Sequence, residues 1–275
     1  MSLTREQFAQ AYGAEQSQLR MQQLQRLSYR ELQELLTGEP TAAAVWIRSA
    51  ADCGLAAAQL RLGRMLLEGT GVPVDAQAAL NWFVRAAAQD NAEAMNMVGR
   101  CLENGWGTPR DLVRAAEHYR SSAERGYDWG EYNFGNLLFD GRGVPRDRRL
   151  AVYWYRRAAR QHHGRAMNLL GRCLEEGWGC APDQVAAALW YERSAETGYF
   201  RGQFNYAAVL AQYGQAAAAA SWYLKAADGG DRAIRGAIVT ALRNAVDPAL
   251  CAVRVRVAAL DHTAGGHDGL SRHPA

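Results

Sequence analysis

The sequence predicts an all-α protein, built as a solenoid of tandem helical hairpins that repeat every 36 residues. Three observations predict this fold class: small residues recur at that spacing, the apolar pattern between them recurs, and a glycine-rich loop divides each repeat. The recurring small residues include Gly63, Gly99, Gly135, Gly171 and Ala207. A fixed period in this range is the signature of a repeat array, in which each unit buries its apolar face against its neighbours.

Each repeat divides into two helices, which we call helix A and helix B. In the second copy, helix A is expected over about 92–104, because Ala94, Val98 and Cys101 share one helical face. Gly99 lies within this face, although glycine inside a helix lowers helix stability by roughly 1 kcal/mol relative to alanine. Its recurrence therefore needs a packing reason, and we predict that helix B approaches the backbone closely at this position. Helix B carries large side chains just before a pair of small ones. The large side chains are Trp82 and Phe83, His118 and Tyr119, Trp154 and Tyr155, Trp190 and Tyr191, and Trp222 and Tyr223.

Four loops share one order of glycine, proline and aspartate. They read GTGVPVD (69–75), GWGTPRD (105–111), GRGVPRD (141–147) and GWGCAPD (177–183). The first glycine suits the left-handed residue that ends helix A, the second relieves the following turn, and proline prevents helix A from continuing. The aspartates fall where helix B begins, so we expect their carboxylates to accept hydrogen bonds from its first amides.

These residues resemble the Sel1-like repeat, a relative of the tetratricopeptide repeat. The pattern is A-x-x-x-L-G, G-x-G-V-x-x-D and W-Y-x-x-A-A-x-x-G within 36 residues, and it covers about 42–230. The resemblance implies a right-handed α/α superhelix that acts as a non-catalytic scaffold or adaptor and binds other proteins. The chain departs from the family pattern at His118, which replaces the usual tryptophan, and at 211–215, where the fifth copy lacks the glycine loop.

The predicted organisation has four parts. They are an N-terminal helical cap (1–41), the repeat array (42–230), C-terminal capping helices (231–261) and a disordered tail rich in glycine and histidine (262–275). Within the array the five full copies are expected at about 55–90, 91–126, 127–162, 163–198 and 199–230.

The first 54 residues precede the regular copies. Thr4 with Gln7 and Ser28 with Glu31 have the spacing of capping boxes, which predicts helices that begin near these positions, the first running from about 5 to 27 with a break near Gly13. Thr41 is expected to cap a third segment, which is helix B of a degenerate first copy. The glutamine-rich first helix either caps the array or pairs with a partner helix, and the cap is the preferred interpretation.

After Gly230 the repeat stops. Asp231 is expected to cap a helix that ends near Ala245, and Pro248 begins a further segment. The alternation of valine and arginine in this last segment is typical of a strand, but its flanking alanines and the helical context favour a helix.

Composition sets limits on function. A net charge of +3 does not by itself indicate nucleic acid or an anionic membrane. The sequence shows no opening run of positive charge followed by an apolar core and no apolar stretch of 18 residues, so we expect neither a secretion signal nor a membrane span, and we expect a cytoplasmic location without a membrane partner. Five cysteines without a CxxC motif predict free structural thiols, of which Cys101 and Cys173 should be buried. Cys180, in a loop, is the best candidate for a reactive thiol, although an ordinary exposed thiol is the alternative.

The helix A positions around the Leu-Gly pair are the candidate partner-binding site, because the resemblance to tetratricopeptide repeats implies that A helices line a concave groove. The candidate residues are Asn96, Arg100, Trp129, Tyr132, Asn136, Asn168 and Arg172. Asparagine can pair with backbone amides and arginine can hold a carboxylate through two hydrogen bonds. The hypothesis is that the groove binds a protein segment of acidic character; the alternative is an ordinary solvated face, and the oligomeric state is left open.

A second candidate surface is basic and lies in the third hairpin. Its residues are Arg142, Arg146, Arg148, Arg149, Arg156, Arg157 and Arg160. Such a patch can meet an acidic protein surface or a phosphate backbone, and nucleic-acid binding is therefore kept as a less favoured alternative.

Catalysis is not expected. Some members of the family have been associated with β-lactam hydrolysis, so a hydrolase remains an alternative, but Lys225, the only lysine, has Trp222 where an S-x-x-K motif needs serine. His118 occupies a packing position, and His162 and His163 lie at a turn. The sequence predicts no cofactor and no metal site.

Overall fold

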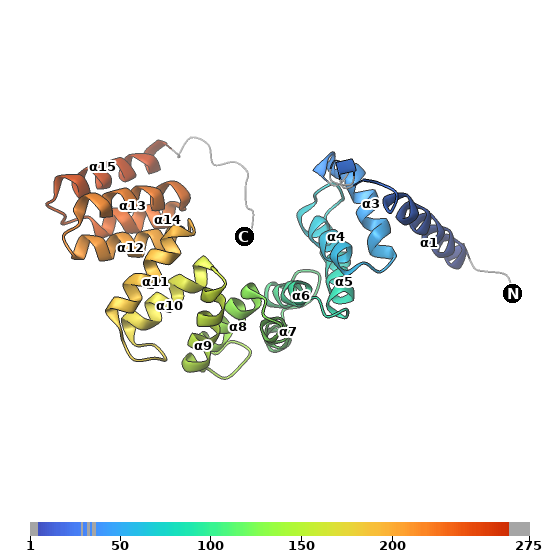
Figure 1. Ribbon diagram of the computed structural model, residues 1–275, viewed down its shortest axis with the longest axis horizontal. Coiled ribbons are helices and arrows are strands. Elements are labelled where there is room, and N and C mark those ends of the chain that lie inside the picture. The colour runs from blue at the N-terminus through green and yellow to red at the C-terminus, as the bar shows by residue number, and fades with distance from the viewer. Residues whose placement is uncertain (1–4, 29, 32–33, 35–36, 264–275) are drawn as a thin grey trace. The chain divides into compact units, whose positions relative to one another are not determined.

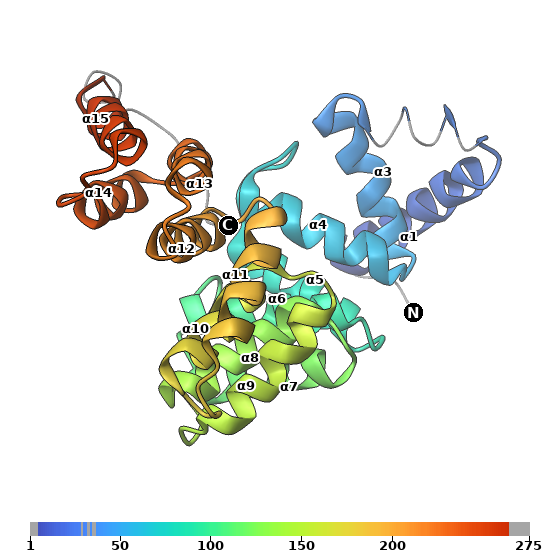
Figure 2. The same cartoon turned by 60° about the vertical axis from the view of Figure 1, so that its left-hand side comes forward.

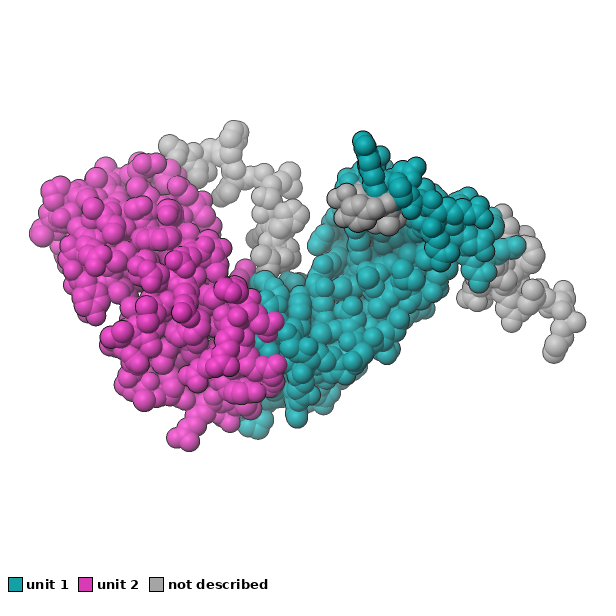
Figure 3. Space-filling model, viewed as in Figure 1, with its two compact units in different colours: residues 1–146 teal, residues 147–275 magenta. Residues whose placement is uncertain are grey.

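The computed structural model describes residues 5–28, 30–31, 34 and 37–263, and every element in these ranges is a helix (Figure 1). The chain divides into two compact units, Met1–Arg146 and Asp147–Ala275 (Figure 3). The all-α class predicted from the 36-residue period is therefore confirmed.

The first unit contains the cap and the first helical hairpins. Its helices are α1 (Arg5–Leu24), α3 (Pro40–Asp52), α4 (Ala56–Glu68), α5 (Ala76–Ala87), α6 (Ala92–Asn104), α7 (Leu112–Glu124) and α8 (Asp128–Asp140). Helix α4 packs on α5 and α6 packs on α7, and each of these hairpins also packs on the next helix along the chain. This is the predicted pairing of helix A with helix B in successive copies.

The second unit continues the array and ends in two further helices. Its helices are α9 (Arg148–Arg160), α10 (Gly164–Glu176), α11 (Gln184–Glu196), α12 (Phe200–Gln212), α13 (Ala216–Gly229), α14 (Arg232–Ala241) and α15 (Pro248–Thr263). Helices α10 and α11 form one hairpin and α12 and α13 form the next. In the hairpin of α12 and α13, the chain turns at Tyr213 and lacks the glycine loop, as the sequence predicts.

The glycine inside helix A allows close contact with helix B. A β-carbon at Gly99 would lie 2.7 Å from the Tyr119 ring, and one at Gly171 would lie 2.8 Å from the Tyr191 ring. Gly63 faces the Phe83 ring in the same way. The close approach predicted from the recurring glycine is confirmed, and it explains why the helix tolerates this residue.

The glycines of the loops have two different physical roles. Gly105 ends α6 in the left-handed conformation with φ 76°, as predicted. Gly107 also has a positive φ of 68°, and a β-carbon there would overlap the carbonyl of Ala76 at the start of α5. The second glycine therefore does more than relieve a turn, because it lets the loop lie directly on the preceding helix B.

The aspartates that follow the loops cap the B helices. The four carboxylates of Asp75, Asp111, Asp147 and Asp183 accept from the amide three residues later at 2.9–3.0 Å. The expected cap at Thr41 is wrong, because Glu39 caps α3 by accepting from the Ala42 amide at 3.1 Å. Pro40 begins the helix, and its missing N–H suits that first position.

The N-terminal helix packs on the array. Helix α1 continues through Gly13 without a break, and it packs on α3, where the Ser17 hydroxyl donates to Asp52 at 3.1 Å. These contacts support the interpretation of α1 as a cap. The Ser28 amide donates to Glu31 at 2.8 Å, which confirms the second capping box, whereas Thr4 lies outside the described residues.

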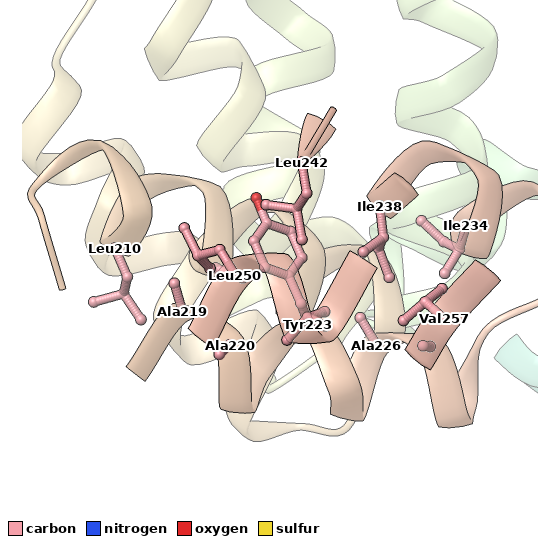
Figure 4. Close-up of a cluster of buried hydrophobic side chains, with 13 residues drawn as sticks. Leu210, Ala219, Ala220, Tyr223, Ala226, Ile234, Ile238, Leu242, Leu250 and Val257 are labelled. Carbon is pink, nitrogen blue, oxygen red and sulfur yellow. The ribbon is translucent and has the colours of Figure 1, made fainter. Parts of the chain in front are cut away.

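The C-terminal helices form a small core with the last hairpin. Helices α12 to α15 lie together in Figure 2, and the close-up in Figure 4 shows Tyr223, Ile238 and Val257 at the centre of their contact. Asp231 caps α14, as predicted, although the helix ends at Ala241 rather than near Ala245. The segment from Pro248 is a helix, so the strand alternative is excluded, and most of the predicted tail, 264–275, lies outside the described residues.

Candidate functional site

The two asparagines predicted to face a partner are buried. Asn96 is 3% exposed and Asn168 is 4% exposed. Each accepts, through its Oδ1, a hydrogen bond from an asparagine on the next helix A: Asn133 donates to Asn96 at 2.9 Å, and Asn205 donates to Asn168 at 2.7 Å. These pairs join successive A helices. Because both side chains are buried in these pairs, neither Asn96 nor Asn168 can contact a partner.

The two predicted arginines each lie over a tryptophan of the following loop. The Arg100 guanidinium is 5.3 Å from the centre of the Trp106 ring, and that of Arg172 is 5.3 Å from the Trp178 ring. Within the described part of the chain, no carboxylate lies within ion-pair distance of either arginine. Each guanidinium therefore keeps hydrogen-bond donors for another molecule while the indole holds its position.

A buried tyrosine and a glutamate stand beside each of these arginines. The Tyr119 hydroxyl donates to Glu103 at 2.7 Å, and the Tyr191 hydroxyl donates to Glu175 at 2.5 Å. In the first unit Arg142 also donates to Glu103, at 2.9 Å. Burial, and then the adjacent carboxylate, raises the pKa of Tyr119 far above its usual value, so this hydroxyl stays a donor.

The predicted residues of the third copy are partly exposed on α8. The Trp129 and Tyr132 rings meet edge to face with centroids 6.0 Å apart, and Asn136 lies one turn further along the helix. Arg64, which matches Arg100 in the first copy, forms an ion pair with Glu93. The first copy therefore differs from the second, because the charge of its arginine is compensated within the chain.

The second and fourth copies carry the same set of residues, 72 residues apart, with one set in each unit. The shared set comprises the buried asparagine, the arginine over tryptophan, and the tyrosine paired with glutamate. Sequence reasoning missed Trp106 and Trp178, because the G-x-G pattern treats that position as variable. Tryptophan at this position in only two of the four loops was the available signal.

The B helices carry a different and more regular cation–tryptophan pair. A cation three residues after tryptophan covers its ring in four copies: Arg85 on Trp82, Arg157 on Trp154, Arg193 on Trp190 and Lys225 on Trp222, at 3.9–4.9 Å. This pair lies within one helix and recurs along the array. We therefore interpret it as a local packing contact of each repeat and not as part of a binding site. It supplies matched controls for Arg100 and Arg172.

The predicted basic patch falls partly in each unit. Arg142 and Arg146 belong to the first unit, where Arg142 is engaged by Glu103 and Asp140. The remaining arginines lie on α9 in the second unit, and of these Arg149, Arg156 and Arg160 are exposed. Arg148 lies over Trp178 at 5.6 Å.

The cysteines are free thiols in the described part of the chain. Burial raises the pKa of Cys101 and of Cys173 to about 12, so both remain protonated at neutral pH, which confirms their structural interpretation. Burial also raises the pKa of Cys180, and its half-buried thiol donates to the Cys173 carbonyl at 3.4 Å. Cys180 therefore lacks the lowered pKa of an activated nucleophile. His163 caps α10, since its Nδ1 accepts from the Ala166 amide at 3.1 Å.

Two hollows in the first unit lie outside the predicted site. One of about 750 Å³ is bordered by Arg61, Arg64 and Glu93, and an apolar one of about 440 Å³ lies between α1 and α3, beside Trp46 and Ile47. Neither hollow could be predicted from the sequence, because the first depends on how α3, α4 and α6 come together and the second on how α1 packs beside α3 and α4. Among the described residues, no group of three histidine, cysteine, aspartate or glutamate side chains could hold a metal ion, and no helix there is long and apolar enough to span a bilayer.

The fold and these contacts define a helical-hairpin repeat protein in which packing and turn residues recur and surface residues vary from copy to copy. The Sel1 repeat model matches five successive segments, 56–91, 92–127, 130–163, 164–199 and 201–231. The chain belongs to the Sel1 repeat family, as its loop and packing motifs predicted. Sel1 repeats generally mediate protein–protein interaction, and their fold is typically a non-catalytic scaffold.

Solved structures show the same fold. A Sel1 repeat protein from Oxalobacter formigenes is 24% identical, with a TM-score of 0.74 over 84% of this chain and 97% of the other. The protein c5321, a protective antigen present in uropathogenic Escherichia coli strains, is 26% identical, with a TM-score of 0.68. That alignment spans 95% of this chain but only 56% of c5321. No curated protein sequence matches the chain.

Proposed function

We propose that the chain is a non-catalytic adaptor that binds acidic segments of another protein at two sites, one at Arg100 in the first unit and one at Arg172 in the second. One observation carries the proposal: each arginine lies over a loop tryptophan, and neither is paired with a carboxylate among the described residues. A guanidinium held in this way offers two parallel N–H groups, which match the geometry of a carboxylate. The aromatic and guanidinium groups are those that interaction hot spots favour.

The surroundings of the two arginines support a binding role over simple solvation. Arg64 at the matching position of the first copy is neutralised by Glu93, and the third and fifth copies have Asn136 and Ala208 there. Glu103 and Glu175 are the nearest acids on the same helices, and tyrosine hydroxyls already engage them. At this one position of the repeat, among the described residues, an arginine without a carboxylate partner is thus found only in the two copies that also hold the loop tryptophan.

Trp129 and Tyr132 extend the proposed surface in the first unit. Both are half-buried on α8, and their edge-to-face contact holds them in place, so they can cover apolar parts of a partner at a small entropic cost. Asn136 adds an amide on the same helix. Asn96 and Asn168 have no part in this proposal, because they are buried.

The test is affinity capture from the native host with three baits: the unaltered chain, R100Q/R172Q, and the control R85Q/R193Q. The control removes the same charge and two cation–tryptophan contacts, also one in each unit, but on B helices. We expect specific proteins to be lost from R100Q/R172Q and kept by the control. Loss of one buried charged contact typically costs about 2–5 kcal/mol and an exposed one about 0.2–1 kcal/mol, so two partly exposed sites should lower affinity roughly tenfold or more.

Circular dichroism of both variants should match that of the unaltered chain, because neither pair of arginines is buried. Identical captures with all three baits would refute the proposal. Equal losses in the two variants would show that only the overall charge matters, which would refute it as well.

A further inference from the structure

Helix α9 carries an exposed row of arginines that the first proposal does not use. Its sequence, RRLAVYWYRRAAR, holds five arginines and no acidic residue. Arg149, Arg156 and Arg160 recur at intervals of seven and four residues, which places them on one face over about 16 Å of helix. Tyr153, 52% exposed, lies within the same row, and we call these four residues the α9 stripe.

The opposite face of α9 is the packing face. Trp154, Tyr155 and Ala158 are buried there, so the stripe points away from the core of the second unit. In the part of the chain that the structure describes, no carboxylate forms an ion pair with Arg149, Arg156 or Arg160. Three like charges on one helical face repel one another, so the row gains stability when an acidic group lies over it.

A hollow adjoins the N-terminal end of the stripe. It has a volume of about 590 Å³ and is lined by Arg149 together with Gly177, Gly179, Cys180 and Ala181 of the glycine loop. The two glycines add no side chains to this wall, and Gly179 lies so close to the Arg148 carbonyl that no β-carbon would fit. A side chain of a bound segment can therefore enter beside Arg149.

We propose that the α9 stripe is a second docking surface, which takes an acidic segment of a protein partner distinct from the one bound through Arg100 and Arg172. A protein partner fits better than nucleic acid for two reasons. The charge is confined to one helix of 13 residues, and the whole chain has a pI of only about 8.6. Arginine and tyrosine are also among the residues enriched at protein interfaces.

Two docking surfaces would allow the chain to hold two partners at once, which is what an adaptor requires. The second proposal does not depend on the first, because the α9 stripe shares no residue with the arginine–tryptophan sites. Its experiment is accordingly carried out with Arg100 and Arg172 already neutralised.

The experiment measures fluorescence anisotropy of a labelled peptide of about 12 glutamates, which spans roughly 40 Å when extended and so exceeds the length of the stripe. Three proteins share the R100Q/R172Q background: the background itself, the stripe variant R149Q/R156Q/R160Q, and the control R232Q/R243Q/R256Q. The control removes three exposed arginines from the same unit. An oligothymidylate of similar charge is the second probe.

We expect the background and the control to bind the glutamate peptide with similar, salt-sensitive affinity, and the stripe variant to bind at least about tenfold more weakly. No binding to the background, or equal loss in the stripe variant and the control, would overturn the proposal. Binding of oligothymidylate in preference to the glutamate peptide would also overturn it, by assigning the surface to nucleic acid.

Discussion

Replacing Gly99 with alanine tests the packing that organises every repeat. The new β-carbon would lie 2.7 Å from two carbons of the Tyr119 ring, about 1 Å inside the normal contact distance of roughly 3.5–4.0 Å. The ring cannot easily move away, because Tyr119 is fully buried and its hydroxyl is bonded to Glu103 at 2.7 Å. We therefore place the overpacking cost in the upper part of the usual range of about 1–3 kcal/mol.

Alanine also favours the helix by about 1 kcal/mol over glycine, so the net expectation for G99A is a loss of about 1–2 kcal/mol. Gly236 is the matched control, because it lies inside α14 and a β-carbon there would meet no atom within 4 Å. We expect G236A to gain about 0.5–1 kcal/mol. The two substitutions are chemically the same and should change stability in opposite directions.

Urea unfolding followed by circular dichroism measures both changes. In a Y119F background the ring has no hydrogen bond to Glu103 and can shift. The loss in free energy of unfolding caused by G99A should therefore be smaller there, by a coupling energy of about 0.5 kcal/mol or more. A G99A protein as stable as the unaltered chain would refute the close packing of helix A on helix B. An unchanged cost in the Y119F background would refute the argument that the hydroxyl holds the ring.

Two further predictions concern ionisation and accessibility. Burial raises the pKa of Tyr223 to about 12 and that of Tyr191 still higher, whereas tyrosines of the unfolded chain ionise near about pH 10. As the pH rises, the tyrosines of the unfolded state therefore lose their protons before those of the folded state. The urea midpoint of unfolding should fall as pH rises above about 10, and it should fall less steeply in a Y191F variant. A thiol reagent at neutral pH should modify the exposed Cys53 rapidly and should reach the buried Cys101 and Cys173 only after urea is added.

Each of these predictions has a result that contradicts it. A urea midpoint that is constant or rises between about pH 9 and pH 11 would show that the tyrosines are not shielded in the folded state. Modification of Cys101 in the folded protein at the rate of Cys53 would show that helix A opens without global unfolding.

Much of the fold followed from local and periodic signals. The hairpins were predictable because glycine, proline and aspartate act on the backbone next to them, so the loop at 105–111 specified both the end of α6 and the start of α7. The recurring glycine also predicted close packing. Thr41 was misassigned as a cap because Glu39, two residues earlier, accepts the same kind of amide hydrogen bond.

The candidate site was less predictable, because a repeat pattern identifies a helical face but not what covers it. Asn96 and Asn168 share the phase of surface residues, yet the next helix A buries them and supplies an asparagine to each. Likewise, Arg100 meets Trp106 only because Gly105 turns the chain back along its own helix.

The sequence by itself determined the hairpin repeat, its caps and its turns, because these depend on backbone preferences and on a period that is written along the chain. The tertiary structure alone decided which of the described arginines remain without a carboxylate partner, that α1 packs on α3, and that the next helix A buries Asn96 and Asn168. The physical reason is distance along the chain. A contact such as Arg142 with Glu103 joins residues 39 positions apart, and only the stacking of one repeat on the next brings them together.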